Sequence, residues 1–326
     1  MQRRTLIQAA AGTAAALALP HLAAQQEWPT GPVRIVVGFP PGGGTDALAR
    51  VVGAKLTEMW KQQVLVENRA GVAGVLAAEY TTTQPADGSV LLMAHINSHA
   101  LGPALQPKLK YDAERDFVPI VLVGVTPNLL IAYPQQKALT VPDIVAAAKA
   151  EPGKVSFGSA GAGSAQHLAL EMFKLAAKVD VIHVPYKGSG PLLTDLIGGQ
   201  IQYSFDTMTA ATPHVKSGKV TAIAQTRARR AKGHPNVPTM QELGYAGFEA
   251  TTWYGLVGPG KLPAAVAAKI NRDVNTVLAM PDVQERMDTY GAEDGGGTQE
   301  KFAAFIKGEI AKWTKVVKEG NVKVDS

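Results

Sequence analysis

Short β-branched segments alternate with longer helical stretches along most of the chain, and this alternation restricts the fold more than any other feature. Val33–Phe39 is apolar and β-branched, and a helix is predicted from an N-cap at Thr45 to about Trp60. A strand at Val64–Glu67 and a helix around Val75–Thr83 follow. The pattern predicts a parallel, doubly wound α/β sheet.

The same alternation continues toward the C-terminus. Further strands are predicted at Ser89–His95, Phe117–Gly124, Leu129–Ala132, Val155–Gly158, Val181–Val184, Ile201–Phe205, Val220–Gln225 and Thr251–Val257. Further helices are predicted at Val141–Ala150 after an N-cap at Thr140, at Ser164–Ala177, Pro191–Ile197, Pro263–Met280 and Gln299–Val317, with one more before Val220. A chain of 326 residues tends to form two units rather than one enlarged core. We therefore expect two α/β units, and the sequence leaves open how often the chain passes between them.

The first residues have the features of an export signal. Met1–Arg4 is basic, Thr5–Leu19 is apolar, and Leu22-Ala23-Ala24 offers small residues for cleavage. The apolar run is too short for a stable membrane span, so residues 1–24 are predicted to be a signal peptide cleaved near Ala24. Its paired arginines resemble a twin-arginine signal, although ordinary secretory leaders also begin in this way.

Composition excludes several classes of protein. The chain contains no cysteine, which excludes disulfide scaffolds, thiol nucleophiles, zinc-thiolate sites and cysteine-ligated iron–sulfur clusters. Removal of residues 1–24 leaves 30 basic and 27 acidic residues, a net charge of +3. Such a mild balance does not indicate nucleic acid or an anionic membrane as a partner.

Three Gly-rich turns each follow a predicted strand and open a predicted helix. They are Gly38–Asp46, Phe157–Ser164 and Pro185–Pro191. The first backbone N–H groups of a helix lack acceptors, and the helix dipole favours an anion there. In an open α/β sheet such turns lie at the carboxyl ends of the strands, where ligands bind. A single turn of this kind is best explained by chain reversal alone, but three turns carrying Ser or Thr favour a carboxylate or phosphate site.

Two nucleotide motifs are partly matched. Gly42-x-Gly44-x-x-Ala47, with Glu67 about 20 residues later, satisfies a loose dinucleotide fingerprint. The preceding Pro40-Pro41 enlarges and stiffens a loop that should be a tight turn, so the match is weak. Gly38-x4-Gly43 resembles a P-loop only until Gly44, where that motif needs Lys.

Catalytic and metal-binding templates are not satisfied. No serine lies in G-x-S-x-G. His95 and His99 lack a following Glu and a third ligand, so a pair at a strand end and in a loop is favoured over a metal site. His167 and Glu171 are predicted to form a surface pair, with a cleft-facing histidine as the alternative.

Two further polar features have open interpretations. Asp206 ends a predicted strand, where it either caps a helix or accepts a hydrogen bond from a ligand amine or hydroxyl. Arg227, Arg229, Arg230 and Lys232 form a basic cluster that is interpreted as a solvated loop, with docking to a partner as the alternative.

Several motifs occur in one order along the mature chain and together carry a resemblance to a known family. They are Val33–Asp46, Val66–Gly71, Ala86-Asp87-Gly88, Phe157–Ser164, Val184–Gly188, Phe205-Asp206, Val237-Pro238-Thr239 with Gly244, and Trp253–Leu256. In these motifs the chain resembles the Bug-type extracytoplasmic solute-binding receptors of tripartite tricarboxylate transporters. The resemblance implies a type II periplasmic-binding-protein fold, with two doubly wound lobes around a ligand cleft that close by hinge rotation. The first lobe would comprise residues 25–125 and 229–326, and the second lobe residues 126–228.

The resemblance also implies a ligand site. In this family two loops from opposite lobes hold a ligand carboxylate, partly through ordered water, and these correspond to Phe39–Gly44 and Ser159–Ser164. Asp206 matches an acidic position in the second-lobe pocket, and Lys187 and Gly188 match the third turn. The expected ligand-binding residues are Phe39, Pro40, Pro41, Gly42, Gly43, Gly44, Asp46, Ser159, Ala160, Gly161, Ser164, Lys187, Gly188 and Asp206. No catalytic residue, metal or cofactor is expected.

Two segments depart from the usual family pattern. Asn68-Arg69-Ala70-Gly71 lacks the Pro that is more usual before the Gly, which we interpret as a structural difference. His95-Ile96-Asn97 stands where small residues are common, which we expect to alter the pocket wall and therefore the ligand.

The expected function is that of a periplasmic receptor. It would capture a small organic acid and deliver it to the membrane subunits of a tripartite tricarboxylate transporter, acting as a monomer without nucleic acid. A ligand-sensing receptor for a membrane kinase is one alternative, and an exported NAD(P)-dependent oxidoreductase is a weaker one. The sequence does not identify the acid.

Overall fold

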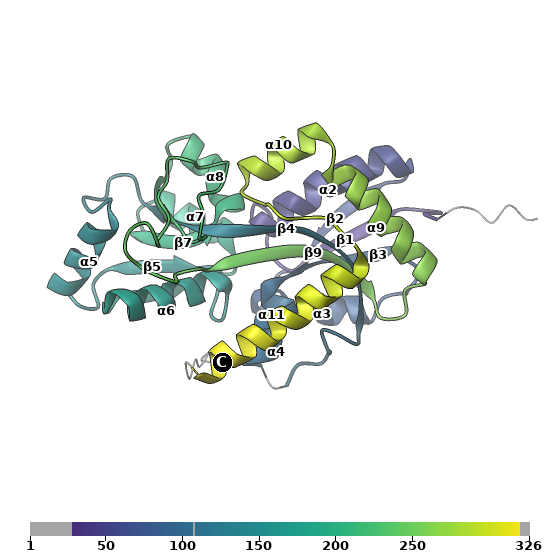
Figure 1. Ribbon diagram of the computed structural model, residues 1–326, viewed down its shortest axis with the longest axis horizontal. Coiled ribbons are helices and arrows are strands. Elements are labelled where there is room, and N and C mark those ends of the chain that lie inside the picture. Colours follow the sequence, from purple (N-terminus) through teal and green to yellow (C-terminus); the bar gives the residue numbers. More distant parts are fainter. Residues whose placement is uncertain (1–27, 107, 320–326) are drawn as a thin grey trace, which may run out of the picture.

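The computed structural model describes residues 28–106 and 108–319, so the predicted signal peptide and its cleavage position lie outside the described residues. Two α/β halves lie side by side and share one sheet (Figure 1). The described strands are β1 (Val33–Val37), β2 (Val64–Asn68), β3 (Val90–His95), β4 (Phe117–Ala132), β5 (Ser156–Ser159), β6 (Ile182–Pro185), β7 (Tyr203–Thr207), β8 (Thr221–Gln225) and β9 (Thr251–Pro259).

The strands form a mixed sheet with the order β2-β1-β3-β9-β4-β7-β5-β6, and β8 pairs with β4. The first half contains β1, β2 and β3, which are parallel to one another. The second half contains β5, β6 and β7, which are also parallel to one another. The prediction of parallel strands is therefore correct within each half.

Two long central strands connect the halves, and their antiparallel direction departs from the parallel sheet predicted from the alternation. β4 and β9 are antiparallel to each other, with Phe117 opposite Pro259 and Pro127 opposite Thr251. β9 also runs antiparallel to β3, and β4 runs antiparallel to β7 and β8. Phe117–Gly124 and Leu129–Ala132, predicted as two strands, form the single strand β4, because Val125–Asn128 stays extended and pairs with β9 and β7.

Helices cover both faces of each half. They are α2 (Gly44–Trp60), α3 (Val75–Thr82), α4 (Gly102–Leu105), α5 (Val141–Ala150), α6 (Ala165–Ala177), α7 (Ser189–Ile197), α8 (Met208–Lys216), α9 (Ala264–Leu278), α10 (Pro281–Thr289) and α11 (Gln299–Glu319). A 3₁₀ turn, η2 (Val72–Gly74), precedes α3, and a π-helical turn, η3 (Asn97–Leu101), precedes α4. None of the helices in the described residues is long and apolar enough to span a membrane.

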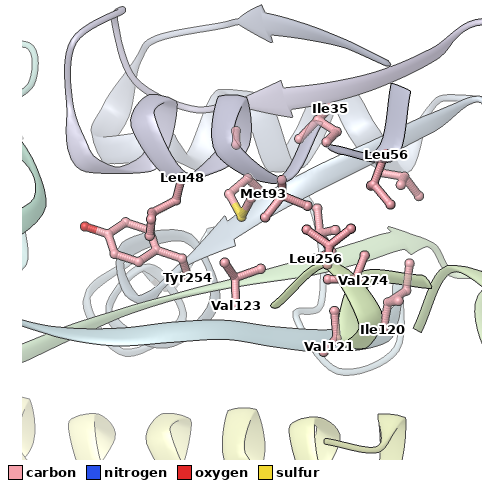
Figure 2. Packing of buried hydrophobic residues seen from close by; sticks show 14 of the residues in the cluster. Ile35, Leu48, Leu56, Met93, Ile120, Val121, Val123, Tyr254, Leu256 and Val274 are labelled. Carbon is pink, nitrogen blue, oxygen red and sulfur yellow. The ribbon is translucent and has the colours of Figure 1, made fainter. Parts of the chain in front are cut away.

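The layers produce a separate hydrophobic core on each face of each half. In the first half, side chains of α2 and α9 pack on one face of the sheet, as Figure 2 shows for Leu48, Leu56 and Val274 against Ile35 and Met93. The opposite face packs against α3 and α11. In the second half, α5 and α6 pack on one face, and α7 and α8 on the other. Burial of this apolar area stabilises each half at about 25 cal/mol per Å².

Three details of the helices differ from the predictions. The N-cap of α2 is Gly43, not Thr45, which lies inside the first turn. Leu175, which shares the helical spacing of Leu168 and Met172, is 77% exposed, whereas Phe173 of the same helix is buried. α10 was not predicted because its sequence is mostly polar and only Val283 and Met287 are buried.

Candidate functional site

The first and third Gly-rich turns meet where the two halves face each other. The first turn leads into α2 and the third leads into α7. A Cβ atom at Gly188 would lie 2.8 Å from Pro40 Cδ, and one at Gly190 would lie 2.9 Å from the Pro41 carbonyl oxygen. Gly188 also has a φ of +123°, a conformation that side chains disfavour. Glycine at these two positions therefore permits the halves to approach at this point.

A narrow cavity with several polar residues in its wall lies beneath this contact. Its lining comes from both halves and comprises Phe39, Gly43, Gly44, Thr45, His95, Ala160, Gln166, Ser189, Thr207 and Tyr254. It has room for about one water molecule. Four of the predicted ligand-binding residues, Phe39, Gly43, Gly44 and Ala160, line it. We call this space the inner cavity.

Asp206 precedes Thr207, the last residue of β7, and is completely buried next to the inner cavity. Its Oδ1 accepts hydrogen bonds from the Ser189 hydroxyl (2.6 Å), the Thr207 N–H (2.7 Å) and the Gln166 amide (3.3 Å). Its Oδ2 has no hydrogen-bond partner among the described residues. Burial raises the pKa of Asp206 to about 6, although the hydrogen bonds from Ser189 and Gln166 oppose this shift.

Other polar atoms around the inner cavity also lack partners. The Tyr254 hydroxyl is buried near Thr207 and Thr209 without a well-formed hydrogen bond. Gln166 Oε1 and Asn97 Nδ2 are buried and likewise unpartnered within the described part of the chain. Buried polar groups are normally hydrogen-bonded, so this concentration of unpartnered atoms indicates a place where a polar ligand or ordered water binds.

Asp46 has a different environment from Asp206. Its carboxylate pairs with Arg50 (2.8 Å), and it accepts hydrogen bonds from Asn68 Nδ2 (2.9 Å) and the Gly42 N–H (3.1 Å). The Arg50 and Asn68 hydrogen bonds, together with that from Gly42, hold the pKa of Asp46 below its usual range against the opposing effect of burial. These contacts fix the shape of the loop before α2.

The second Gly-rich turn is held by hydrogen bonds within its own half. Ser159 Oγ contacts His183 Nε2 (2.6 Å) and also accepts a hydrogen bond from the Gly161 N–H (3.2 Å). The Gly163 N–H donates to His167 Nδ1 (3.1 Å), and the His167 ring stacks on His183 with centroids 4.0 Å apart. Burial lowers the pKa of His183 to about 4. His167 and Glu171 approach each other at 3.6 Å, but the His167 side chain is only 12% exposed, so the pair does not lie on the surface as predicted. The histidine ring instead supports the second Gly-rich turn.

The three helix N-termini differ in how their first N–H groups are satisfied. At α6, Ser164 caps the helix by accepting from the His167 N–H (3.2 Å), and Asn97 Oδ1 accepts from the Ala165 N–H (3.1 Å). The N-cap residues of α2 and α7 are Gly43 and Gly188, which have no side chain that could accept a hydrogen bond, so neither helix has a side-chain cap. The uncapped N-termini of α2 and α7 are therefore the better anion sites.

An open groove of about 810 Å³ extends outward from the inner cavity. Phe39 and Ala160 line both spaces. The predicted residue Lys187 lies at the groove with an exposed side chain, and Gly161, which has a φ of +129°, lies in its wall. We call this space the outer groove.

The remaining polar features do not form a second site. Burial lowers the pKa values of His95 and His99 to about 3, so both rings are neutral, and His95 Nε2 contacts the Thr252 hydroxyl at 2.8 Å. No metal-ligand cluster is found within the described residues. Glu67 pairs with Arg34 (2.8 Å) and also with Arg69, so its carboxylate is engaged by arginines.

The basic cluster after β8 is a network of ion pairs. Arg227 is buried and pairs with Glu293 (3.0 Å) and with Asp294, so its interpretation as part of a solvated loop is wrong. Lys232 pairs with Asp288 at 3.1 Å, and Arg230 with Glu242 at 2.9 Å. The pairs of Arg227 and Lys232 connect the segment after β8 to the segment around α10.

Several residues of the inner cavity were not predicted. Thr207 and Ser189 adjoin residues that were predicted, Asp206 and Gly188. Tyr254 lies in the Trp253–Leu256 motif, but it comes from β9, far along the chain from the Gly-rich turns. Gln166 lies inside α6, where its polar side chain gives no signal of its direction.

Comparisons with known proteins agree with this architecture. The model of the family described as "Tripartite tricarboxylate transporter family receptor" matches residues 48–322. Protein BugT of Bordetella pertussis is 36% identical over 298 residues, which is 91% of this chain and 91% of BugT.

Solved structures are similar over almost their whole length. Rpa4515 of R. palustris with adipate is 33% identical, with a TM-score of 0.88, covering 91% of this chain and 99% of that one. The periplasmic binding protein BugD is 32% identical, with a TM-score of 0.86 and coverages of 91% and 99%. MatC (Rpa3494) from Rhodopseudomonas palustris with bound malate is 31% identical, with a TM-score of 0.82 and coverages of 89% and 100%. The chain therefore belongs to the tripartite tricarboxylate transporter receptors, a family of periplasmic solute-binding proteins.

Proposed function

We propose that this chain captures a small organic acid between its two halves and delivers it to the membrane subunits of a tripartite tricarboxylate transporter. The main support is the meeting of two uncapped helix N-termini with buried, unpartnered polar atoms. The N-termini are those of α2 and α7, and the atoms include Asp206 Oδ2 and the Tyr254 hydroxyl. The N-termini supply N–H donors for a carboxylate, and the polar atoms supply contacts for the rest of the ligand.

The proposed site keeps the predicted residues but divides their tasks. Gly43, Gly44 and Gly188 bring backbone N–H groups to the carboxylate, and Asp206 accepts a hydrogen bond from a hydroxyl or amine of the ligand. Asp46 and Ser164 hold the loops in shape through the contacts described above. Phe39 and Ala160 form the walls between the inner cavity and the outer groove.

Ligands of two similar proteins support the carboxylate class, since the structures of Rpa4515 and MatC contain adipate and malate. Closure of the two halves excludes water and thereby strengthens hydrogen bonds to the acid. In this proposal residues 25–125 and 229–326 form one lobe and residues 126–228 the other, with β4 and β9 crossing between them. The protein acts as a periplasmic monomer after cleavage near Ala24.

A thermal-shift screen of the mature protein tests the proposal. The panel contains mono-, di- and tricarboxylates, together with NAD(H) and NADP(H). An acid at about 100 times its dissociation constant stabilises the protein by roughly 2.7 kcal/mol, which raises the melting temperature measurably. A shift with one or more acids supports the receptor function, and a shift with the dinucleotides alone would overturn it. N-terminal sequencing of exported protein checks the cleavage position.

A further inference from the structure

Asn97 connects the two halves of the molecule through a contact that ligand capture does not explain. It lies just after β3 in the first half, and its Oδ1 accepts a hydrogen bond from the Ala165 N–H at the start of α6 in the second half (3.1 Å). Asn97 is 2% exposed, so water competes little for this hydrogen bond. Both partners are groups of the protein, and the contact therefore needs no ligand.

The turn that carries Asn97 holds this residue in place. The turn is η3, a π-helical turn, and turns of this rare geometry are frequent at functional positions. The Asn97 N–H donates to His95 Nδ1 (3.1 Å), and His95 Nε2 contacts the Thr252 hydroxyl (2.8 Å). The Tyr111 hydroxyl donates to the Ser98 carbonyl oxygen (2.6 Å). Groups from three separate segments thus fix the backbone from which Asn97 reaches α6.

The hydrogen bond satisfies a group that α6 does not satisfy itself. Ala165 is the first residue of α6, and the first N–H groups of a helix have no acceptor within that helix. The Ser164 cap accepts from the His167 N–H instead, so Asn97 is the acceptor for Ala165. Separation of the halves breaks this bond. Its net free energy therefore favours the closed arrangement by a factor of about 2 to 10.

Apolar side chains of α6 reinforce the same contact. Ala165 and Leu168 are buried in a hydrophobic cluster whose other members lie in the first half and in the crossing strands β4 and β9. Leu101 of η3 and Trp313 of α11 are among these members. If the halves moved apart at this point, apolar surface of α6 and of the first half would be exposed to water, which is unfavourable.

We infer that Asn97 is a positioning residue that holds the two halves in their closed arrangement before a ligand binds. Its side-chain carbonyl group binds the first N–H of α6 from the opposite half, and Ala165 and Leu168 complete the contact. A closed arrangement that is populated in advance lowers the free energy that a ligand must supply for closure. This role goes beyond the capture of an acid, because it concerns the equilibrium between open and closed halves and does not depend on which ligand is captured.

Hydrogen exchange of the ligand-free mature protein, followed by NMR for individual residues, tests the inference. Refolding from urea removes any ligand that is purified with the protein. The Ala165 N–H has no acceptor in its own helix, so its protection reports the contact with Asn97. This amide should be protected in the wild type and should exchange about 2- to 10-fold faster in Asn97→Ala. Small-angle X-ray scattering should show a larger radius of gyration for the variant.

Two further variants separate closure from a general loss of stability. Asn97→Asp keeps a side-chain oxygen at the N-terminus of α6, where the helix dipole favours an acceptor, and it should retain the protection of Ala165. Thr140→Ala removes the side-chain cap of α5, which is also in the second half but accepts its hydrogen bond from Asp143 of the same helix. It should lower the unfolding free energy but leave the exchange of Ala165 and the radius of gyration unchanged.

Several results would overturn the inference. Rapid exchange of Ala165 in the wild type does so without any variant, and so does an unchanged exchange rate in Asn97→Ala. Equal acceleration by Thr140→Ala would assign the effect to stability, and equal loss of protection in Asn97→Asp would exclude the acceptor role. Circular dichroism checks that each variant is folded. Because no ligand takes part, these results are independent of the carboxylate screen, so failure of the inference and failure of the proposed function are distinguishable.

Discussion

Two Gly-rich loops that look alike in the sequence have different structures. Phe39–Gly44 leads into α2 without a side-chain cap, whereas Ser159–Ser164 leads into α6 through a Ser164 cap and a contact from Asn97. The second loop satisfies its N–H groups within the protein, and the first leaves those of α2 to be satisfied at the cleft. An anion site at a helix N-terminus therefore depends on the absence of a cap as much as on the presence of glycine.

Both loops contact histidines that are kept neutral by burial. The largest predicted effect, a loss of unfolding free energy at acidic pH, tests this shared feature. His95 packs against Phe39, and His183 contacts Ser159. Their pKa values are lowered to about 3 and about 4, and that of His99 to about 3, so the unfolded chain binds more protons below its ordinary histidine pKa of about 6.5. The unfolding free energy should fall by on the order of 5 kcal/mol between pH 6.5 and pH 4.

Urea unfolding across this pH range measures the fall. His183→Gln should retain most of the loss, because His95 and His99 remain. A flat profile between pH 6.5 and pH 4 would show that these rings are not kept neutral by burial.

Neighbouring glycines of the first loop should differ sharply in their tolerance of a methyl group. A Cβ at Gly44 would lie 2.5 Å from the Tyr254 hydroxyl and 2.9 Å from Thr207 Oγ1, whereas at Gly43 the nearest atom is 3.8 Å away. Gly44→Ala should lower the unfolding free energy by about 1–3 kcal/mol through overpacking. Gly43→Ala should change it by less than about 0.5 kcal/mol. Thermal denaturation compares the two, and equal effects would remove the close packing around Tyr254 from the explanation.

The buried carboxylate of Asp206 lowers the stability of the folded protein, and the second Gly-rich loop contributes no such destabilising charge. Because its folded pKa is about 6, above the ordinary Asp value, the folded state loses stability as the pH rises from about 4 through 6. Asp206→Asn should therefore raise the unfolding free energy by about 1–3 kcal/mol at pH 8, and the gain should shrink toward pH 4. Ligand affinity should fall in the same variant. A gain that is independent of pH would contradict the assignment of the cost to a buried charge.

Removing the side-chain cap of α6 and adding one to α2 tests the comparison of the two loops, and these changes have the smallest expected effects on the unfolding free energy. Ser164→Ala should cost about 1 kcal/mol through loss of the α6 cap. Gly43→Ser should add a few tenths of a kcal/mol by capping α2, because Gly43 already has the extended backbone of an N-cap. If the α2 N–H groups bind ligand, Gly43→Ser weakens carboxylate binding more than Ser164→Ala does. Calorimetric titration of both variants with one acid decides this.

Local signals were sufficient to predict most elements. The Thr140 cap of α5 is confirmed by its hydrogen bond from the Asp143 N–H, and the helices and parallel strands of each half follow the alternation of the sequence. These features depend on side-chain spacing and caps within a few residues, which the sequence displays directly. The residues of the site were harder to predict from the sequence, because Tyr254 and Thr207 reach it only through the pairing of β9 with β3 and of β7 with β4.

The sequence by itself determined the alternation of strands and helices, the three Gly-rich helix starts and the position of Asp206 near the end of a strand. Only the tertiary structure decided that β4 and β9 run antiparallel to each other and that the α2 and α7 N-termini meet. It also decided that Asn97 Oδ1 accepts a hydrogen bond from the first N–H group of α6. The reason is physical: strand pairing and capping by a distant side chain depend on contacts between residues that are far apart in the sequence. Local propensity specifies each element, but the packing of the two halves specifies which polar groups remain unsatisfied.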